Sequence, residues 1–278
     1  MLGFRRQNET LSLSCYILTL DSERRISQVL ESVRNIADEI LIIDSGSKDT
    51  TLDRAASYGA RILHRKFDNF RDQRIFAESH CAHNWVLALD SDEVLSGTLQ
   101  TSIRTIKLNT LSCDPDTPPD AFAMQRDWFF LGKPVRNFYP VRTPERVIRL
   151  FRRDKATHFG SRIIHEQLQV NNLNIKTLPG SILHYSCDSI HDLYGKVNLY
   201  TSLAALDMHK RGIKPNWIKT NIYPWVIWAQ WQILYRGILD GREGLILGKY
   251  IRDTTYLKYL KLTELRQQCG HIGKPTSQ

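Results

Sequence analysis

This 278-residue chain lacks paired cysteines and an N-terminal apolar segment. Its five cysteines are scattered along the sequence, and none stands in a Cys-Xaa-Xaa-Cys spacing. No apolar stretch typical of a secretory signal opens the sequence, and the first apolar run begins only at Leu11. We therefore expect neither a disulfide framework nor a structural zinc site, and we expect the protein to work in a reducing cytoplasm.

Signatures of nucleic-acid binding are also missing, although the net charge of +9 must attract anions. The sequence has no zinc-finger spacing, no RNA-binding aromatic motif and no long basic tail. Positive charge by itself is equally compatible with phosphorylated substrates and with an anionic membrane surface. We therefore expect no nucleic-acid partner.

The N-terminal third alternates strand-like and helix-like segments. Apolar runs at residues 11–20, 39–43 and 85–90 are typical of buried strands. Residues 22–35 carry apolar side chains at helical spacing, and residues 74–82 read as a further helix before the third of these runs. Such alternation predicts βαβ units and a mostly parallel α/β sheet with flanking helices.

Three prolines in residues 113–120 interrupt this pattern, because proline disfavours both helices and central strands. We predict a loop there, between an N-terminal half at residues 10–112 and a second half at residues 120–190. From residue 191 to 278 the pattern becomes helical. The sequence thus predicts one α/β region in two halves, followed by a helical extension.

Carboxylates stand where two predicted strands end. One strand runs into Trp85-Val-Leu-Ala-Leu-Asp90-Ser-Asp92-Glu93, and another closes on Asp44. Parallel sheets bind ligands at the carboxyl edge of their strands, where Asp90 and Asp92 could share a divalent cation with a phosphate ligand. Asp44 could accept hydrogen bonds from a nucleobase or a ribose. The alternative stays open that these residues only form turns and helix caps.

Several motifs, in order and spacing, resemble family 2 glycosyltransferases. Three of them are Leu18-Thr-Leu-Asp-Ser-Glu23, Ile42-Ile-Asp-Ser-Gly-Ser-Lys-Asp49 and Leu87-Ala-Leu-Asp-Ser-Asp-Glu93. Four more resemble the branch that contains lipopolysaccharide inner-core glucosyltransferases: Asp68-Asn-Phe-Arg-Asp-Gln-Arg74, Arg149-Leu-Phe-Arg-Arg153, Ile164-His-Glu166 and Gly237-Ile-Leu-Asp-Gly241. The likeness covers most of the chain, outside the proline-rich loop and the tail.

This resemblance implies the GT-A fold, a nucleotide-diphosphate sugar donor such as a UDP-sugar, a divalent metal (Mn or Mg), and inversion at the anomeric carbon. Residues 10–112 would then bind the donor and residues 120–190 the acceptor. By motif, Asp44 would contact the base, Asp90 the ribose or sugar, and Asp92 the metal together with Asp90. The remaining donor contacts implied by the motifs are Thr19, Asp21, Arg74, Ser91 and Arg149.

Two departures from the family pattern concern the donor side. Asp21-Ser22-Glu23 replaces the usual Asn-Glu after the first strand, which makes the role of Asp21 near the base less secure. At Arg74-Ile75 the basic residue is kept, but Ile75 stands where the family often has Asn.

An inverting transfer needs a base that takes the proton of the attacking hydroxyl. Glu166, in the matching His-Glu motif, is our candidate, while Glu93 competes with it and is better suited to support the metal loop. The role of His165 is left open. Fixed cations must also stabilise the leaving diphosphate, and the candidates are Arg74, Lys133, Arg149, Arg152 and Arg153.

An aromatic segment from Trp217 to Arg236 contains four of the six tryptophans. Lysine, asparagine, proline and glutamine interrupt it, so we predict that it does not span a membrane. With its flanking basic residues it suits a helix lying in a membrane interface near a lipid-linked acceptor. A helix packed on the catalytic domain is the alternative.

We therefore expect a metal-dependent inverting hexosyltransferase that adds one sugar to a cell-envelope glycan or glycolipid, as in lipopolysaccharide biosynthesis. It would act in the cytoplasm, and the anionic cytoplasmic face of the membrane is a candidate peripheral partner. The alternatives are a nucleotidyltransferase, for which no Gly-rich loop with a lysine is visible near the first strand, and a non-catalytic module that binds a sugar nucleotide or a membrane surface.

Overall fold

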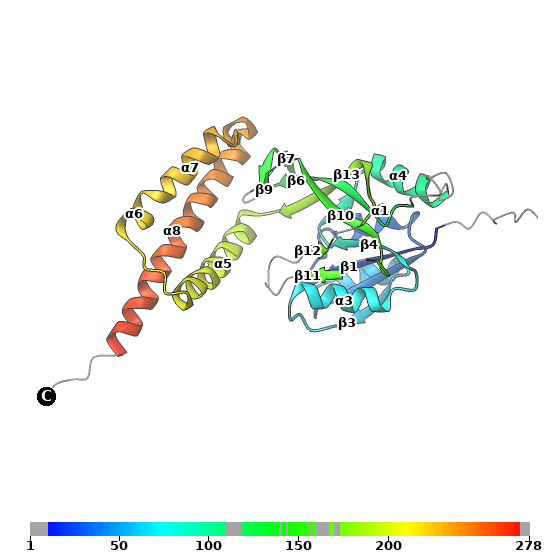
Figure 1. The fold of residues 1–278 in the computed structure, drawn as a ribbon, viewed down its shortest axis with the longest axis horizontal. Coiled ribbons are helices and arrows are strands. Elements are labelled where there is room, and N and C mark those ends of the chain that lie inside the picture. Colours follow the sequence, from blue (N-terminus) through cyan, green and yellow to red (C-terminus); the bar gives the residue numbers. More distant parts are fainter. Residues whose placement is uncertain are drawn as a thin grey trace, which may run out of the picture. The chain divides into compact units, whose positions relative to one another are not determined.

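The computed structural model describes residues 11–108, 118–138, 141–142, 144–155, 157–159, 167–169 and 173–272. The chain divides into two compact units. Unit 1 comprises Met1–Asp127 and Pro144–His184, and unit 2 comprises Trp128–Thr143 and Tyr185–Gln278. Each unit has its own apolar core. Figure 1 shows the helices and strands of both units.

Four parallel strands form the first part of the sheet in unit 1, in the order β3-β2-β1-β4. Their side chains are mostly apolar, and β1 is buried along nearly its whole length, as expected for a strand covered on both faces. The strands are β1 (Leu13–Thr19), β2 (Glu39–Asp44), β3 (Arg61–His64) and β4 (Trp85–Asp90). All four end at one edge of the sheet.

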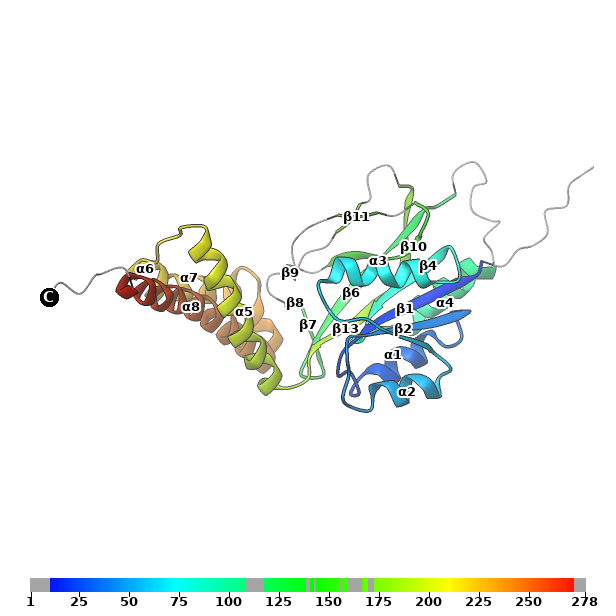
Figure 2. The ribbon, with the colours of Figure 1, turned by 90° about the horizontal axis from the view of Figure 1, so that it is seen from below.

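Helices cover both faces of these strands (Figure 2). Alternate residues of β1 point to opposite faces, so Cys15 and Ile17 belong to one apolar cluster and Tyr16 to another. The first cluster includes side chains of three helices and the second includes Ala77 of a fourth. These helices are α1 (Ile26–Val33), α2 (Thr51–Ser57), α4 (Gly97–Leu108) and α3 (Phe70–His80).

The other strands continue the sheet beyond β4 in the order β10-β6-β13-β5, with β7 on β6. Antiparallel pairing joins β10 to β4 and to β6, and β13 to β5. Their bounds are β5 (Glu93–Leu95), β6 (Ala121–Phe130), β7 (Lys133–Val135), β10 (Glu145–Arg152) and β13 (Ile175–Cys187). Two small antiparallel pairs are β8 (Asn137–Phe138) with β9 (Val141–Arg142), and β11 (Thr157–Phe159) with β12 (Gln167–Gln169).

The predicted α/β class with flanking helices and a helical C-terminal region is confirmed, with the parallel pairing in the N-terminal strands. Two helix starts were predicted wrongly. Helix α1 begins at Ile26 rather than at residue 22, after a turn in which the Arg25 N–H donates to the Ser22 carbonyl. Helix α3 begins at Phe70 rather than Arg74, because the Asn69 side chain accepts a hydrogen bond from the Asp72 backbone N–H and caps the helix there. The assignment of residues 10–112 to the donor and 120–190 to the acceptor stays a prediction.

Unit 2 is mainly helical, and its other helices pack against the long C-terminal one. Its elements are α5 (Ile190–Lys210), α6 (Trp217–Asn221), α7 (Tyr223–Ile233), the 3₁₀ turn η1 (Gly237–Asp240) and α8 (Gly241–Ile272). A side chain at Gly244 would collide with the backbone of Gly237, and one at Gly248 with Gln232 of α7. These glycines therefore permit the close packing of α7 and η1 on α8.

No helix in the described part of the chain is long and apolar enough to cross a membrane, which agrees with the prediction for the aromatic segment.

Candidate active site

The acidic residues predicted at strand ends lie at one edge of the sheet. In the parallel register, Thr19 of β1 pairs with Asp44 of β2, and Leu18 of β1 pairs with Asp90 of β4. Strand β1 therefore stands between the two carboxylates. Because the strands are parallel and end together, the sequence pattern alone was sufficient to place these residues at the same edge of the sheet.

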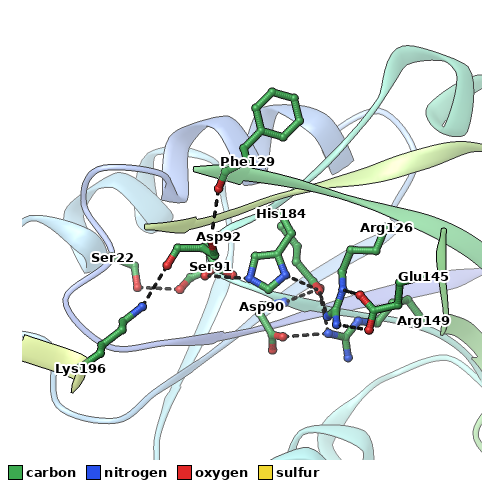
Figure 3. A network of polar contacts seen from close by, with 12 residues as sticks. Ser22, Asp90, Ser91, Asp92, Arg126, Phe129, Glu145, Arg149, His184 and Lys196 are labelled. Atoms are coloured by element: carbon green, nitrogen blue, oxygen red, sulfur yellow. Dashed lines mark hydrogen bonds and ion pairs between the residues drawn. The ribbon is translucent and has the colours of Figure 1, made fainter. Parts of the chain in front are cut away.

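Asp90 is held between two arginines, Arg74 and Arg149, and Figure 3 shows the contact with Arg149. One carboxylate oxygen accepts a hydrogen bond from Arg74 of α3 at 2.7 Å, and the other accepts one from Arg149 of β10 at 2.8 Å. Although burial opposes ionisation, these guanidinium groups hold the pKa of Asp90 well below its ordinary value. Asp90 is therefore a fixed carboxylate, and its two arginines form a fixed cationic pair beside it.

Glu93 is the fully buried centre of the same network. One carboxylate oxygen accepts hydrogen bonds from Arg149 at 2.7 Å and from Arg126 at 3.2 Å. The other accepts from the backbone N–H of Asp90 at 3.1 Å, and Arg126 also pairs with Glu145. Such a carboxylate orients its neighbours and is poorly placed to accept a proton from a substrate, which favours the supporting role over that of a base.

Asp92 lies next to a histidine that the sequence analysis did not single out. His184 of β13 pairs in register with Glu93 of β5, and its Nε2 lies 3.4 Å from Asp92 Oδ2. Burial lowers the pKa of His184, but the neighbouring Asp92 outweighs this effect and raises it above the ordinary value. Asp92 and His184 thus form one pair at the end of the β13–β5 ladder.

This pair is also the donor set that best fits a divalent metal. Across the described residues, no group of three or more His, Cys, Asp and Glu side chains is already arranged around a cation position. Asp92 and His184 supply one oxygen and one nitrogen, and neighbouring ligands of an octahedral cation lie about 3 Å apart. Two protein ligands suit a metal that a diphosphate and water complete. Asp90 is less available, because both its oxygens accept from arginines.

Asp44 is buried and bound by its own turn. It accepts hydrogen bonds from the backbone N–H groups of Gly46 at 2.9 Å and Ser47 at 3.0 Å, and His64 Nδ1 lies 3.3 Å away. Burial opposes its ionisation, but the hydrogen bonds from Ser47 and Gly46 keep the pKa of Asp44 below its ordinary value. The carboxylate is therefore ionised and held in one orientation at the C-terminal end of β2.

The loops after β1, β2 and β4 are joined by side-chain hydrogen bonds. Asp21, at φ 46°, accepts from the Lys48 backbone N–H at 2.8 Å, a left-handed conformation that Asp tolerates. The hydroxyl of Ser22 lies 2.7 Å from that of Ser91, between Asp90 and Asp92. Ser22, which belongs to the departure from the family's Asn-Glu, thus places its hydroxyl against the loop that carries Asp90 and Asp92.

The other predicted cations lie elsewhere. Arg153 donates to the carbonyls of Glu78 and Cys81, where it satisfies the C-terminal end of α3. Arg152 pairs with Asp154 on the surface, and Lys133 pairs with Glu243 within unit 2. Among the five arginines and lysines considered, only Arg74 and Arg149 contact Asp90.

The predicted base Glu166 and its neighbour His165 lie outside the described residues. Glu166 therefore stays a prediction from the sequence.

His184 and Arg126 are the site residues that the sequence analysis missed. Arg126 lies in the middle of β6, and His184 lies three residues before the end of β13. A polar residue that closes an apolar strand was the signal used for Asp44 and Asp90, and neither Arg126 nor His184 carries it. Nothing local distinguishes Arg126, because its partner Glu145 comes from another strand.

Known proteins show several similarities to this chain. The model of the family described as glycosyl transferase family 2 matches residues 14–155. An uncharacterized glycosyltransferase of Rickettsia typhi is 30% identical over 271 residues, which cover 94% of this chain and 89% of the relative. A lipopolysaccharide core biosynthesis glycosyltransferase of Rhizobium meliloti, LpsC, is 26% identical over 258 residues, covering 85% of this chain and 88% of the relative.

One similar solved structure is glucosyl-3-phosphoglycerate synthase from Mycobacterium tuberculosis in complex with Mn²⁺, UDP and phosphoglyceric acid. It superposes with a TM-score of 0.44 at 16% identity, over 74% of this chain and 80% of that one.

Proposed function

This chain belongs to glycosyltransferase family 2 and uses a nucleotide-sugar donor; from this premise we propose a metal-dependent inverting hexosyl transfer to a cell-envelope glycan or glycolipid. The proposed donor is a UDP-sugar. The observation that carries the proposal is that Asp44, Asp90 and Asp92 lie at the same edge of the sheet, with two arginines beside Asp90 and a histidine beside Asp92.

On the donor side, each residue has a proposed role that follows from its chemistry. Asp44 accepts a hydrogen bond from the base, and Asp90 accepts one from a ribose or sugar hydroxyl. Thr19 ends β1 beside Asp44, Asp21 lies in the loop after β1, and Ser91 directly follows Asp90, all at the same edge of the sheet. Because the carboxylates of Asp44 and Asp90 are ionised and held by hydrogen bonds, binding the donor requires little rearrangement of the protein.

Asp92 and His184 are the proposed metal ligands. When bound, a divalent cation neutralises negative charge on the diphosphate of the donor. Arg74 and Arg149 contribute fixed positive charge at the same edge, and Asp90 and Glu93 hold them there. The protein therefore stabilises the leaving group with charges that do not need to move during the reaction.

On the acceptor side, the proposed base is Glu166. The hydroxyl oxygen of the acceptor forms a bond to the anomeric carbon while the bond from that carbon to the diphosphate oxygen breaks. The carboxylate of Glu166 takes the hydroxyl proton, and the nucleoside diphosphate leaves with the bonding electrons. Attack from the side opposite the leaving group inverts the anomeric configuration.

The proposed acceptor class rests on the similarity to the Rhizobium meliloti lipopolysaccharide core enzyme. By the same reasoning we place the enzyme on the cytoplasmic face of the membrane, where a growing glycolipid would be within reach.

Two variants test the proposal, with isothermal titration of UDP-sugars in Mn²⁺ for binding and release of UDP for turnover. Asp92→Ala should lose both metal-dependent donor binding and turnover. Glu166→Gln should keep donor binding and lose turnover by a factor of about 10²–10⁴, because an amide cannot accept the proton.

Full turnover in Asp92→Ala would contradict the metal assignment, and loss of donor binding in Glu166→Gln would place that residue in the donor site. A wild-type protein that binds UDP-sugars but transfers to no envelope acceptor and hydrolyses none would instead be a binding module. Release of pyrophosphate from a nucleoside triphosphate would indicate a nucleotidyltransferase.

A further inference from the structure

A basic segment without acids runs through unit 2. From residue 208 to residue 239 the sequence has no Asp or Glu, whereas Asp207 and Asp240 stand directly outside it. The arginines and lysines within it are all exposed: Lys210, Arg211, Lys214, Lys219 and Arg236. Of these, Arg211 pairs with Asp207 on the surface. The segment therefore presents a surface of one charge sign.

Helix α7 within this segment is apolar on both of its faces, apart from the exposed Gln230. Pro224 and Trp231 are buried in unit 2, on the side that packs toward α8. Ile222, Trp225, Val226 and Ile233 are exposed, and their spacing of three, four and seven residues puts them on one side of the helix. Helices that face water normally carry polar residues on the exposed side. The exposed side of α7 is instead mostly apolar, which is typical of a surface that contacts an apolar partner.

The apolar surface extends at both ends of α7. At one end, Trp217 and Ile218 of α6 are 69% and 60% exposed. At the other, Ile233 and Leu234 are 73% and 72% exposed just before η1, where Ile238 and Leu239 are also exposed. We call the exposed apolar side chains of α6, α7 and η1 the apolar face.

The charges near the apolar face favour an anionic bilayer over a second copy of the protein as its partner. In a twofold dimer the same face would meet itself, and residues 208–239 of one copy would offer the basic residues of the other copy no acid. A bilayer with anionic headgroups offers both an apolar layer for the aliphatic and indole groups and negative charge for the lysines and arginines. Tryptophan and tyrosine are the residues that prefer this boundary, and Trp217, Tyr223 and Trp225 are exposed here.

We propose that unit 2 docks on an anionic lipid bilayer through the apolar face, with α7 lying in the plane of the headgroups. Docking of this kind needs no spanning helix, and no helix of the described residues qualifies as one. The inference uses only unit 2 and does not depend on the donor, metal or base assignments.

The test is sedimentation of the full-length protein with vesicles of equimolar phosphatidylcholine and phosphatidylglycerol, compared with vesicles of phosphatidylcholine alone. The double variant Ile233→Asp/Leu234→Asp should weaken binding to the anionic vesicles at least about tenfold, since it adds two negative charges and removes two aliphatic groups. Raising the salt concentration should weaken wild-type binding as well.

The matched control is Leu199→Asp/Leu203→Asp on α5, where two exposed leucines of the same unit are replaced with the same chemistry. It should keep wild-type binding, and circular dichroism should show native helicity in both double variants. Equal binding to both vesicle types, equal loss in the control, or no vesicle binding by the wild type would overturn the proposal. A wild-type dimer that Ile233→Asp/Leu234→Asp converts to a monomer in light scattering would assign the face to a second copy.

Discussion

The two units place their unusual residues in opposite environments. At the sheet edge of unit 1, charged side chains are buried, and the carboxylates of Asp90 and Glu93 each accept from two donors or more. On the apolar face of unit 2, indole and aliphatic side chains are exposed. A buried charge is stable only when partner groups are held in a fixed geometry around it. An exposed apolar surface needs no such partners, but covering it with another apolar surface releases free energy.

Chemically similar residues behave differently in the two units for this reason. Arg149 is buried and donates to Asp90 and Glu93, which together outweigh burial and raise its pKa. Arg236 is exposed at a turn between apolar residues. The first arginine belongs to a rigid site, and the second belongs to a surface that can accept many anions.

The strongest test of this contrast is Glu93→Ala. Removing the buried carboxylate takes away an ion-pair partner of both Arg149 and Arg126. This loss should lower the free energy of unfolding by about 3–5 kcal/mol. Glu31→Ala removes a carboxylate whose pair with Arg34 is more than half exposed, and it should cost no more than about 0.5 kcal/mol. Urea denaturation followed by circular dichroism measures both values. If Glu93→Ala lowered the free energy of unfolding as little as Glu31→Ala, the buried network would not be important for stability.

Two tryptophans of α7 provide the equivalent test in unit 2. Trp231 is 2% exposed and lies in the apolar core of the unit, so Trp231→Ala should cost about 3–5 kcal/mol. Trp225 is 54% exposed and its ring faces Arg252 at 4.8 Å, so Trp225→Ala should cost only about 0.5–1 kcal/mol. Thermal denaturation of the two variants would contradict this prediction if Trp225→Ala proved the more harmful.

The smallest expected effect concerns the pH dependence of stability. The pKa of Asp90 is lower in the folded protein than in the unfolded chain, where it is about 3.9. Its pairs with Arg74 and Arg149 therefore stabilise the fold above about pH 4, and this contribution is lost as the pH falls toward the folded pKa.

Asp90→Asn has no such contribution to lose. Between about pH 6 and about pH 3 the wild type should lose about 1 kcal/mol more free energy of unfolding than this variant, because only the unfolded chain takes up a proton at Asp90 over that range. Urea denaturation at the two pH values measures the difference. Parallel losses in the two proteins would mean that the arginines do not stabilise the charged form.

Much of the fold could be predicted from local pattern. Apolar runs closed by Asp44 and Asp90 predicted strands and their common edge, since parallel strands that alternate with helices end together. The start of α3 was predicted wrongly, because Asn69 caps the helix before its apolar spacing begins. The prediction that the aromatic segment does not span a membrane rested on its polar interruptions, which are visible residue by residue.

The partners of the site residues could not be predicted in this way. Arg74 and Arg149 were expected near the donor, but not as the two groups that hold Asp90, from 16 and 59 residues away. Arg153 belonged to the same predicted motif and instead binds the carbonyls at the end of α3.

By itself, the sequence determined the α/β class and the position of the acids at the strand ends. It also determined the single charge sign of the segment at residues 208–239, because these properties depend on the order of residues along the chain. Only the tertiary structure decided that His184 meets Asp92, that Glu93 is buried between two arginines, and that α7 keeps one apolar side exposed. Those outcomes depend on strand register and helix packing, which bring together residues that no local pattern relates.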